Sequence, residues 1–315
     1  MHTTLELRPV PPFRLDLTVW AIRRRPDNTI DRWDGQTYRR VLATDGLPPF
    51  EVAVSQTGTA EAPHLNVALS TSADSDEAQA HATRALQYLL GINLSLEEFY
   101  RLADGDERLR SLAGRFRGFK PPRFPSHFET LVNAISCQQL SLNVGIRLLC
   151  LLAARYGPAV SGDEGTFHAF PRPRDVAQAD VDELRQMGFS YSKARYITGL
   201  AQAIVSGQLD LRELEDLEDE AALTRLTQLK GVGRWTAEYF LLRGLGRTHV
   251  FPADDAGARN NLQQWLGLRA PMSYEKIQRT LEPWQGFGGM VFFHLLLKSL
   301  DEKGLLPNIH GPGES

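Results

Sequence analysis

Cysteine and long apolar runs are both scarce in this chain of 315 residues. Its 2 cysteines, Cys137 and Cys150, exclude a disulfide-built fold and favour reduced thiols in the cytoplasm. There is no run of about 18 apolar residues, so we predict no transmembrane helix and no association with a membrane. Residues 5–14 are broken by Glu6, Arg8 and prolines, and they lack the apolar core of a secretion signal. The acids and histidines match no zinc pattern, and no Ser-His-Asp or Cys-His set stands out.

A strong charge of one sign is also missing, because the formal net charge is −3. Residues 210–220 hold seven acids against one base, Arg212, so the rest of the chain carries +3. The composition therefore does not exclude a polyanionic partner, which needs only one basic face on the protein. We expect residues 210–220 to be a solvated helix face that points away from such a partner.

The remaining composition is that of an ordinary globular protein, with 42% hydrophobic and 23% charged residues. A chain of this length can form two or three domains or lobes with a buried core. Before residue 75, alternating apolar and polar positions predict an antiparallel sheet with strands at 13–19, 50–54 and 65–69.

From residue 76 the apolar spacing is helical almost throughout, and no internal repeat occurs. The predicted helices are at about 76–90, 95–102, 126–155, 175–187, 190–206, 219–228, 234–245, 256–265, 274–281 and 287–303. The predicted fold class is mostly α within the α+β class, with an antiparallel β lobe before a larger helical body. We place a β-rich domain at 1–100 and a helical domain at 101–315.

Two glycines one residue apart, Gly231 and Gly233, separate two of these predicted helices. Such a turn exposes backbone N–H groups at the start of a helix, an arrangement that suits a phosphate. A dinucleotide-binding fingerprint would need a strand before the glycines, but residues 221–229 are helical by period. The turn alone leaves two readings open: a helix-hairpin-helix that holds a DNA backbone, or a tight turn without function.

A carboxylate pair, Asp254 and Asp255, follows one helix length downstream of the glycines. The chain can fold back there toward the turn, which would place a carboxylate near a bound phosphate. This combination suggests chemistry on nucleic acid.

Three motifs extend the pattern around the glycines. Residues 229–237 read Leu-x-Gly-Val-Gly-x-x-Thr-Ala, and a helix and an apolar-Pro stretch ending in aspartate follow. Residues 135–141 carry Ile-x-x-Gln-Gln-x-Ser, and residues 188–197 carry Gly-x-Ser-x-x-Lys-Ala-x-x-Ile. With these motifs the sequence resembles the helix-hairpin-helix (HhH-GPD) DNA glycosylase superfamily, and within it the 3-methyladenine DNA glycosylase II type. The resemblance is strong over 125–300 and looser before. It implies a two-lobed all-helical glycosylase body after the β lobe, with the helix-hairpin-helix at about 219–245.

The resemblance places the family's catalytic aspartate on Asp255. A carboxylate there would stabilise the oxocarbenium-like sugar that forms as an N-glycosidic bond breaks, and it could orient the attacking water. Asp254 would then cap the following helix or orient a hydrogen bond, although both acids could simply be caps of the helix that begins near Ala256. The residues implied to contact DNA lie on the hairpin: Lys230, Gly231, Val232, Gly233, Arg234 and Thr236.

Trp235 bears on the mechanism that the resemblance implies. Lyase-type members have a lysine immediately before the Thr/Val-Ala pair, where it attacks the sugar as a Schiff-base nucleophile. With Trp235 in that position we expect a monofunctional enzyme without lyase activity. No cysteine follows Cys150, so no iron–sulfur cluster is expected and no cofactor is predicted. The backbone carbonyls of Thr227, Leu229 and Val232 could hold a monovalent cation, as the family's hairpins often do.

Trp235 and Tyr239 stand four residues apart and share a helix face. By resemblance that face lines the pocket for the flipped base, with Phe293 as a further lining residue, and the alternative is that these rings are core. An aromatic wall favours a cationic alkylated purine. Gln139 is the candidate wedge that fills the gap in the duplex, with Leu140 in reserve, and a buried glutamine at a helix start is the alternative.

The predicted function is a monofunctional DNA glycosylase of base excision repair, which hydrolyses the N-glycosidic bond of alkylated purines such as 3-methyladenine and 7-methylguanine. One alternative is a glycosylase for oxidised or deaminated purines, such as 8-oxoguanine or hypoxanthine. The other is a non-catalytic helix-hairpin-helix module that only binds DNA. The expected partner is double-stranded DNA with a damaged base, the expected state a monomer, and the expected location the cytoplasm, associated with the nucleoid.

Overall fold

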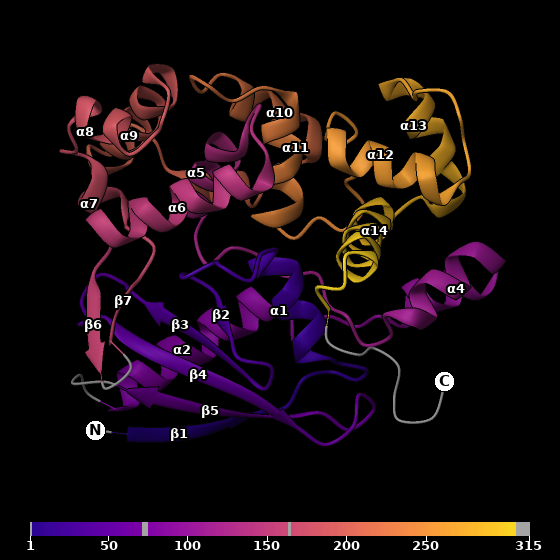
Figure 1. The fold of residues 1–315 in the computed structure, drawn as a ribbon, viewed down its shortest axis with the longest axis horizontal. Coiled ribbons are helices and arrows are strands. Elements are labelled where there is room, and N and C mark those ends of the chain that lie inside the picture. Colours follow the sequence, from indigo (N-terminus) through magenta and orange to yellow (C-terminus); the bar gives the residue numbers. More distant parts are fainter. Residues whose placement is uncertain (1, 71–74, 163–164, 307–315) are drawn as a thin grey trace.

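The computed structural model describes residues 2–70, 75–162 and 165–306. The N-terminal part forms an antiparallel sheet of five strands in the order β1-β5-β4-β3-β2 (Figure 1). Its strands are β1 (His2–Leu7), β2 (Arg32–Trp33), β3 (Thr37–Leu42), β4 (Phe50–Thr57) and β5 (His64–Ser70).

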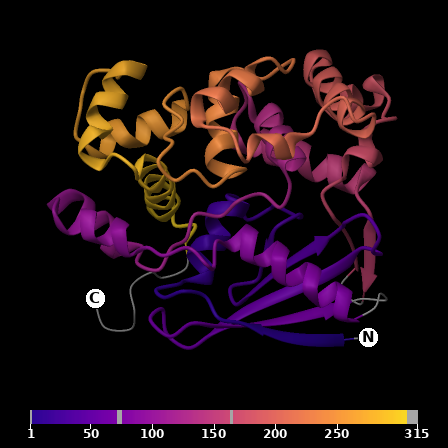
Figure 2. The same ribbon diagram turned by 180° about the vertical axis from the view of Figure 1, so that it is seen from behind.

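The two central strands confirm the predictions at 50–54 and 65–69 and show why the pattern was readable. Burial alternates along β4 and β5, so one face of the sheet carries the apolar side chains. That face packs against apolar residues of α2 (Ser75–Leu90), which runs along the sheet (Figure 2). The sheet therefore has a core of its own, as the antiparallel β lobe requires.

The rest of the chain is mainly helical and builds two further apolar cores. One is formed by α5 to α11, which follow one another in the chain. The other combines α3 and α4 with the C-terminal helices α12 to α14, which lie across the helical body from α7, α8 and α9 (Figure 1). The helices are α3 (Glu97–Asp104), α4 (Glu107–Arg115), α5 (His127–Cys137), α6 (Leu142–Tyr156), α7 (Pro173–Val176), α8 (Val181–Gln186), α9 (Tyr191–Val205), α10 (Asp219–Thr227), α11 (Arg234–Arg243), α12 (Ala256–Trp265), α13 (Tyr274–Leu281) and α14 (Gly288–Glu302), with 3-10 turns η1 (Leu211–Leu214) and η2 (Glu282–Trp284).

The predicted strand at 13–19 is wrong, because helix α1 (Leu15–Arg23) occupies this segment. Eight of its nine residues are buried, so its apolar positions surround the helix instead of marking one stripe. A helix that is buried all round loses the 3.6-residue signal, and its alternating leucines then read as a strand.

The single helix predicted over 126–155 is two helices, α5 and α6, that meet at a turn. Gln139 has a left-handed backbone with φ of 55°, and Ser141 caps α6 through its hydroxyl, which accepts from the N–H of Val144 at 3.5 Å. Gly145 packs against Cys137 so closely that an added Cβ would lie 2.6 Å from the Cys137 sulfur. The helical spacing of apolar residues continues across the turn between α5 and α6, and for this reason the sequence pattern predicted one helix.

The body is not all-helical, because an antiparallel hairpin of β6 (Ala159–Gly162) and β7 (Gly165–His168) extends from it toward the sheet (Figure 1). The acidic segment 210–220 is also not one helix face. It consists of η1, a short connection and the start of α10, although its glutamates are exposed as expected. No helix within the described residues is long and apolar enough to cross a membrane.

A buried ion cluster joins the sheet to the helical body. Arg40 on β3 lies 2.6 Å from Asp31 and 2.6 Å from Glu129 on α5, and its side chain is 2% exposed. Tyr38 donates its hydroxyl to the same Asp31 oxygen, Oδ1, at 2.7 Å, so two side chains of β3 converge on this carboxylate. The sheet is thus fixed to α5, the helix that ends at the Gln139 turn.

Candidate active site and nucleic-acid interface

The hairpin between α10 and α11 is a tight turn that needs glycine at Gly231. This residue has φ of 84°, a left-handed conformation that L side chains rarely adopt. An added Cβ would lie within 3.0 Å of the Tyr196 ring, a separation that real Cβ atoms essentially never show. The backbone conformation and the neighbouring Tyr196 ring therefore explain why glycine is needed at position 231.

The second glycine, Gly233, has no such internal explanation. Its backbone is extended, with φ of −97° and ψ of −177°, and an added Cβ would have nothing within 4 Å. It is the N-cap of α11 and has no side chain to cap the helix, so the first N–H groups of α11 receive no hydrogen bond from their N-cap residue. Lys230 and Arg234 are exposed on either side. The arrangement offers amides and positive charge to an anion that approaches the backbone closely.

Gln138 fastens the α5–α6 turn to this hairpin. Its side-chain amide donates to the Gly231 carbonyl and to the Thr236 hydroxyl, both at 2.8 Å. Lys193 at the start of α9 holds the same turn, because its ammonium donates to the carbonyls of Ser136 at 3.0 Å and Gln138 at 2.6 Å. The sequence assigned no role to Gln138 or Lys193. Each lies within one of the motifs that the chain shares with the glycosylase superfamily, and this position was the only indication of a role.

The predicted wedge lies at the tip of that turn. Gln139 is exposed, which excludes the alternative of a buried glutamine. Leu140 beside it is 41% exposed. Gln138, the residue before them, donates to the Gly231 carbonyl. The structure thus joins the turn that carries the wedge candidates to the hairpin between α10 and α11.

Asp255 is held from two sides. Its Oδ2 accepts from the Trp235 indole N–H at 3.0 Å, and its Oδ1 accepts from the backbone N–H of Ala258 at 2.8 Å. Asp255 is therefore the N-cap of α12, as the alternative reading expected of it. Asp254, predicted to be a cap or to orient a hydrogen bond, is not the cap and is exposed. Capping does not compete with a chemical role here, because the two bonds fix the direction of a half-buried carboxylate.

Trp235 and Tyr239 stack at the start of α11, with ring centroids 5.5 Å apart and planes 35° apart. Trp235 is half-buried, whereas Tyr239 is 5% exposed and forms the wall behind it. The Tyr239 hydroxyl accepts from Arg24 at 3.2 Å and donates to Asn133 at 3.4 Å. Trp235 is thus the partly exposed ring of the pair, and its indole lies beside the Asp255 carboxylate.

Phe293 does not reach that face, because its ring is fully buried. It packs on Phe119 with centroids 5.6 Å apart, and the Arg243 guanidinium lies 5.0 Å from its ring centre. Burial lowers the pKa of Arg243 to about 10. In this structure Phe293 is a core residue, as the alternative reading of these rings expected.

The residues of the predicted cation site lie together on the hairpin. The Leu229 carbonyl accepts from the Val232 N–H at 3.1 Å, and the Thr227 hydroxyl donates back into α10. A bound monovalent cation stays a prediction. Within the described residues, no group of three or more His, Cys, Asp or Glu side chains could hold a metal ion.

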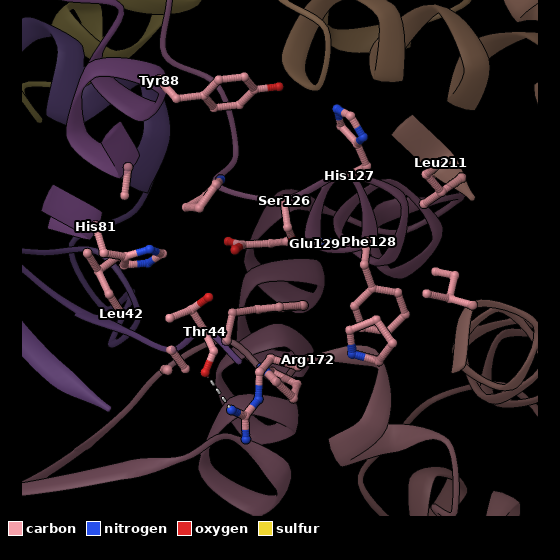
Figure 3. Close-up of a pocket in the computed structure, with 18 of the residues that line it drawn as sticks. Leu42, Thr44, His81, Tyr88, Ser126, His127, Phe128, Glu129, Arg172 and Leu211 are labelled. Atoms are coloured by element: carbon pink, nitrogen blue, oxygen red, sulfur yellow. Dashed lines mark hydrogen bonds between the residues drawn. The ribbon is translucent and has the colours of Figure 1, made fainter. Parts of the chain in front are cut away.

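A cavity of about 560 Å³ lies elsewhere, between the sheet and the helical body. Figure 3 shows His81, His127, Glu129 and Arg172 around it, and Arg172 donates to the Thr44 carbonyl at 3.0 Å. None of the residues predicted for catalysis, base binding or DNA contact lines this cavity. It is a gap between the two parts of the molecule and separate from the Asp255 site.

Comparison with known proteins agrees with this geometry. The family model for the HhH-GPD superfamily of base excision DNA repair proteins matches residues 132–286. A solved structure of the 3-methyladenine DNA glycosylase from Archaeoglobus fulgidus is similar, with a TM-score of 0.80 and 30% identity over 96% of this chain and 100% of that chain. The DNA-3-methyladenine glycosylase of Bacillus subtilis (strain 168) is 26% identical over 200 residues, which are 64% of this chain and 66% of that protein. The DNA-3-methyladenine glycosylase 2 of Escherichia coli (strain K12) is 31% identical over 170 residues, 54% of this chain and 58% of that protein.

Proposed function

The chain belongs to the HhH-GPD superfamily of base excision DNA repair proteins, and from this we propose that it is a DNA glycosylase that removes alkylated purines from duplex DNA. The observation that supports this most directly is the Asp255 carboxylate, held by the Trp235 indole at 3.0 Å. Similar proteins from three organisms are named for 3-methyladenine, which supports the lesion class.

The hairpin would hold the DNA backbone. A phosphate that meets the uncapped start of α11 satisfies its first N–H groups and faces the positive end of the helix dipole. Lys230 and Arg234 add charge on either side. Such contacts position the duplex and carry no sequence information, which suits an enzyme that acts on lesions in any sequence.

The damaged nucleotide would leave the stack and enter beside Trp235, while Gln139 or Leu140 fills its place. A purine alkylated at N3 or N7 is cationic, and stacking on an aromatic ring stabilises a cation by about 1–2 kcal/mol when water is excluded. The half-buried Trp235 ring backed by Tyr239 is suited to this contact.

Hydrolysis then follows from the position of Asp255. The bond between C1′ and the base nitrogen breaks, its electron pair leaves with the base, and positive charge develops on the sugar. The fixed carboxylate stabilises that charge. The cationic purine leaves as a neutral base, and water adds its oxygen to C1′ and releases one proton to the solvent. An abasic sugar remains in an unbroken strand.

The central experiment measures free bases released from methylated, oxidised and deaminated duplexes by chromatography. Asp255→Asn should slow release by about 10²–10³-fold, because one preorganised electrostatic contact is lost. Asparagine keeps an oxygen that can cap α12, so the variant should fold. Release by Asp255→Asn at the wild-type rate would contradict the mechanism.

The same panel separates the alternatives. Release of 8-oxoguanine or hypoxanthine in preference to alkylated bases would identify the other glycosylase class. Tight binding of all duplexes with no base released from any would identify a DNA-binding module.

We also propose that the enzyme is monofunctional, because a side chain without an amine, Trp235, occupies the position of the lyase lysine. Borohydride treatment during turnover should trap no covalent protein–DNA adduct, and product strands should stay intact until alkali is added. A trapped adduct would contradict this proposal. Its loss in Lys230→Ala would identify that lysine as the nucleophile, and its persistence would assign the attack to a different amine.

A further inference from the structure

Two buried arginines contact the ring that backs Trp235. Arg24 follows the last residue of α1 and is 6% exposed, and Arg243 is the last residue of α11 and is 1% exposed. The Arg24 guanidinium donates to the Tyr239 hydroxyl at 3.2 Å. The Arg243 guanidinium lies 5.8 Å from the centre of the Tyr239 ring. Because Tyr239 stacks on Trp235, both cations lie behind the ring that is proposed to receive the base.

The hydrogen-bond partners of both guanidinium groups within the described residues are neutral. Arg24 also donates to the Ile22 carbonyl at 3.3 Å and to the Asn133 amide oxygen at 3.0 Å. Arg243 donates twice to the Ala21 carbonyl, at 3.1 and 3.2 Å, and its Nε is buried without a partner. The backbone of Arg24 is left-handed, with φ of 57°, which adds strain. Buried charges without an opposite charge cost folding free energy, so two of them behind one ring call for a role.

The acids whose charge reaches Arg24 are already paired with another cation. Asp31 and Glu129 each lie 2.6 Å from Arg40 in the cluster that joins the sheet to α5. Burial lowers the pKa of Arg243 to about 10, so its guanidinium stays charged at neutral pH. The aromatic wall of the base site therefore has positive charge behind it.

The charge of the departing base depends on the lesion. A cationic alkylated purine leaves as a neutral base. An uncharged base such as hypoxanthine keeps the electron pair of the bond to C1′ and leaves as an anion. Water adds its oxygen to C1′, and the proton that it gives up neutralises this anion. Positive charge behind the ring therefore repels the first kind of base and stabilises the second as it leaves.

We propose that Arg24 and Arg243 determine the charge selectivity of the base site. The partly exposed ring of Trp235 favours a cation, and the two buried guanidinium groups oppose this preference from behind Tyr239. Uncharged bases thereby remain substrates beside cationic ones. The inference rests on the proposed function for its kinetic consequences, whereas the affinities for cationic and uncharged bases can be measured without any reaction.

The test compares two duplexes that resist hydrolysis because the damaged nucleotide carries a 2′-fluoroarabino sugar. One contains 7-methylguanine, which keeps its positive charge in slightly acid solution, and the other contains uncharged hypoxanthine. Arg24→Gln removes the charge and keeps an amide that can donate to Tyr239. The ratio of the two Kd values should shift about tenfold toward the cationic duplex, as expected for like charges about 10 Å apart at an effective dielectric constant of about 20. Arg243→Gln should shift the ratio in the same direction, and it carries the test if Arg24→Gln does not fold.

Two control variants separate charge from position. Arg23→Gln removes a buried arginine one residue away, whose guanidinium donates to the Trp33 carbonyl at 2.8 Å and lies over the Trp20 ring. Tyr239→Phe removes the hydroxyl that Arg24 binds and keeps both of the proposed cations. In each control the ratio of the two Kd values should stay within about twofold of wild type.

The outcomes are distinct. Kd values that rise together in Arg24→Gln and Arg243→Gln, with an unchanged ratio, would overturn the proposal. So would a ratio that shifts as far in Tyr239→Phe or Arg23→Gln as in Arg24→Gln. On cleavable duplexes, the single-turnover release of hypoxanthine relative to 7-methylguanine should fall about tenfold in Arg24→Gln. If no duplex releases a base, the proposed function fails, whereas the ratio of Kd values still decides the charge selectivity.

Discussion

At the scale of single residues, Gly231 and Gly233 look alike in the sequence, but glycine occupies the two positions for different physical reasons. Gly231 is fixed by its left-handed backbone and by the Tyr196 ring. Gly233 has an ordinary extended backbone and free space beside it. Only the second position leaves room for a group from outside the protein.

Alanine at each position should therefore give opposite results. Gly231→Ala should destabilise the protein by about 1–3 kcal/mol, because it forces a side chain into a strained backbone and against a ring. Gly233→Ala should leave the free energy of unfolding within about 0.5 kcal/mol of wild type and weaken DNA binding severalfold.

Urea unfolding and a salt-dependent DNA-binding titration measure the two effects separately. The phosphate role of the hairpin would be refuted by a Gly233→Ala protein that binds DNA as tightly as wild type at every salt concentration.

Much of the candidate site was predictable at this scale, because motif residues near Asp255 and Trp235 do gather in space. The roles inside the motif were less visible. Which acid caps α12 depends on where the helix begins, and a shift of one residue exchanges Asp254 and Asp255. The burial of Phe293 was not visible either, because the sequence pattern of an aromatic residue on a helix is the same whether the residue faces a core or a pocket.

At the scale of elements, the turn between α5 and α6 connects the fold to the proposed chemistry. Its Gln138 side chain is the link that joins this turn, which carries the wedge candidates, to the hairpin, with two hydrogen bonds of 2.8 Å. Removing this link frees the turn without touching Asp255.

Gln138→Ala should slow base release by about tenfold or more while Asp255 keeps its bond to Trp235, because misplaced groups around a reacting centre reduce the rate strongly. Its Tm should fall by only a few degrees. Gln202→Ala, which loses one bond of 2.9 Å to the Ala177 carbonyl on another face, is the control. Equal rates for both variants would show that the turn needs no such fastening.

The sequence predicted most elements of the helical body but not their breaks. The helical spacing of apolar residues continues through Gln139, so Ser141, a good N-cap residue, was the only indication in the sequence that a new helix begins there. The opposite failure occurred at α1, where burial on all sides erased the helical period. Periodicity reports a contrast between two faces, and it fails where this contrast is absent.

At the scale of the whole molecule, the Arg40 cluster fixes the sheet to the helical body. Arg40→Met should destabilise the protein by about 3–5 kcal/mol, because it leaves Asp31 and Glu129 buried without a cation. Arg101→Met, in an exposed pair with Glu97, should cost no more than about 0.5 kcal/mol.

The pH dependence checks the cause of this loss. Burial already raises the pKa of Glu129, and removal of Arg40 takes away the charge that opposes this rise. In Arg40→Met the raised carboxyl pKa favours the native state at low pH, so the deficit relative to wild type should shrink as the pH falls. Urea titrations at several pH values measure it, and a deficit independent of pH would assign the loss to packing.

The arrangement of the helical cores could not be read from the sequence. Nothing in the apolar pattern of α3 and α4 indicates that their partners are α12 to α14 and not the neighbouring α5. Such pairing depends on the shape of assembled surfaces, which local spacing does not encode.

The pairing of α3 and α4 with the C-terminal helices has a consequence for folding during synthesis on the ribosome. Helices α5 to α11 are contiguous and can assemble as soon as they have been synthesised. Helices α3 and α4 share their core with α1, which precedes them, but that core stays incomplete until α14, about 170 residues later in the chain, has emerged from the exit tunnel. The nascent chain therefore needs protection from aggregation for most of its translation, and a premature stop before α14 would release a product with half of its glycosylase body unable to close.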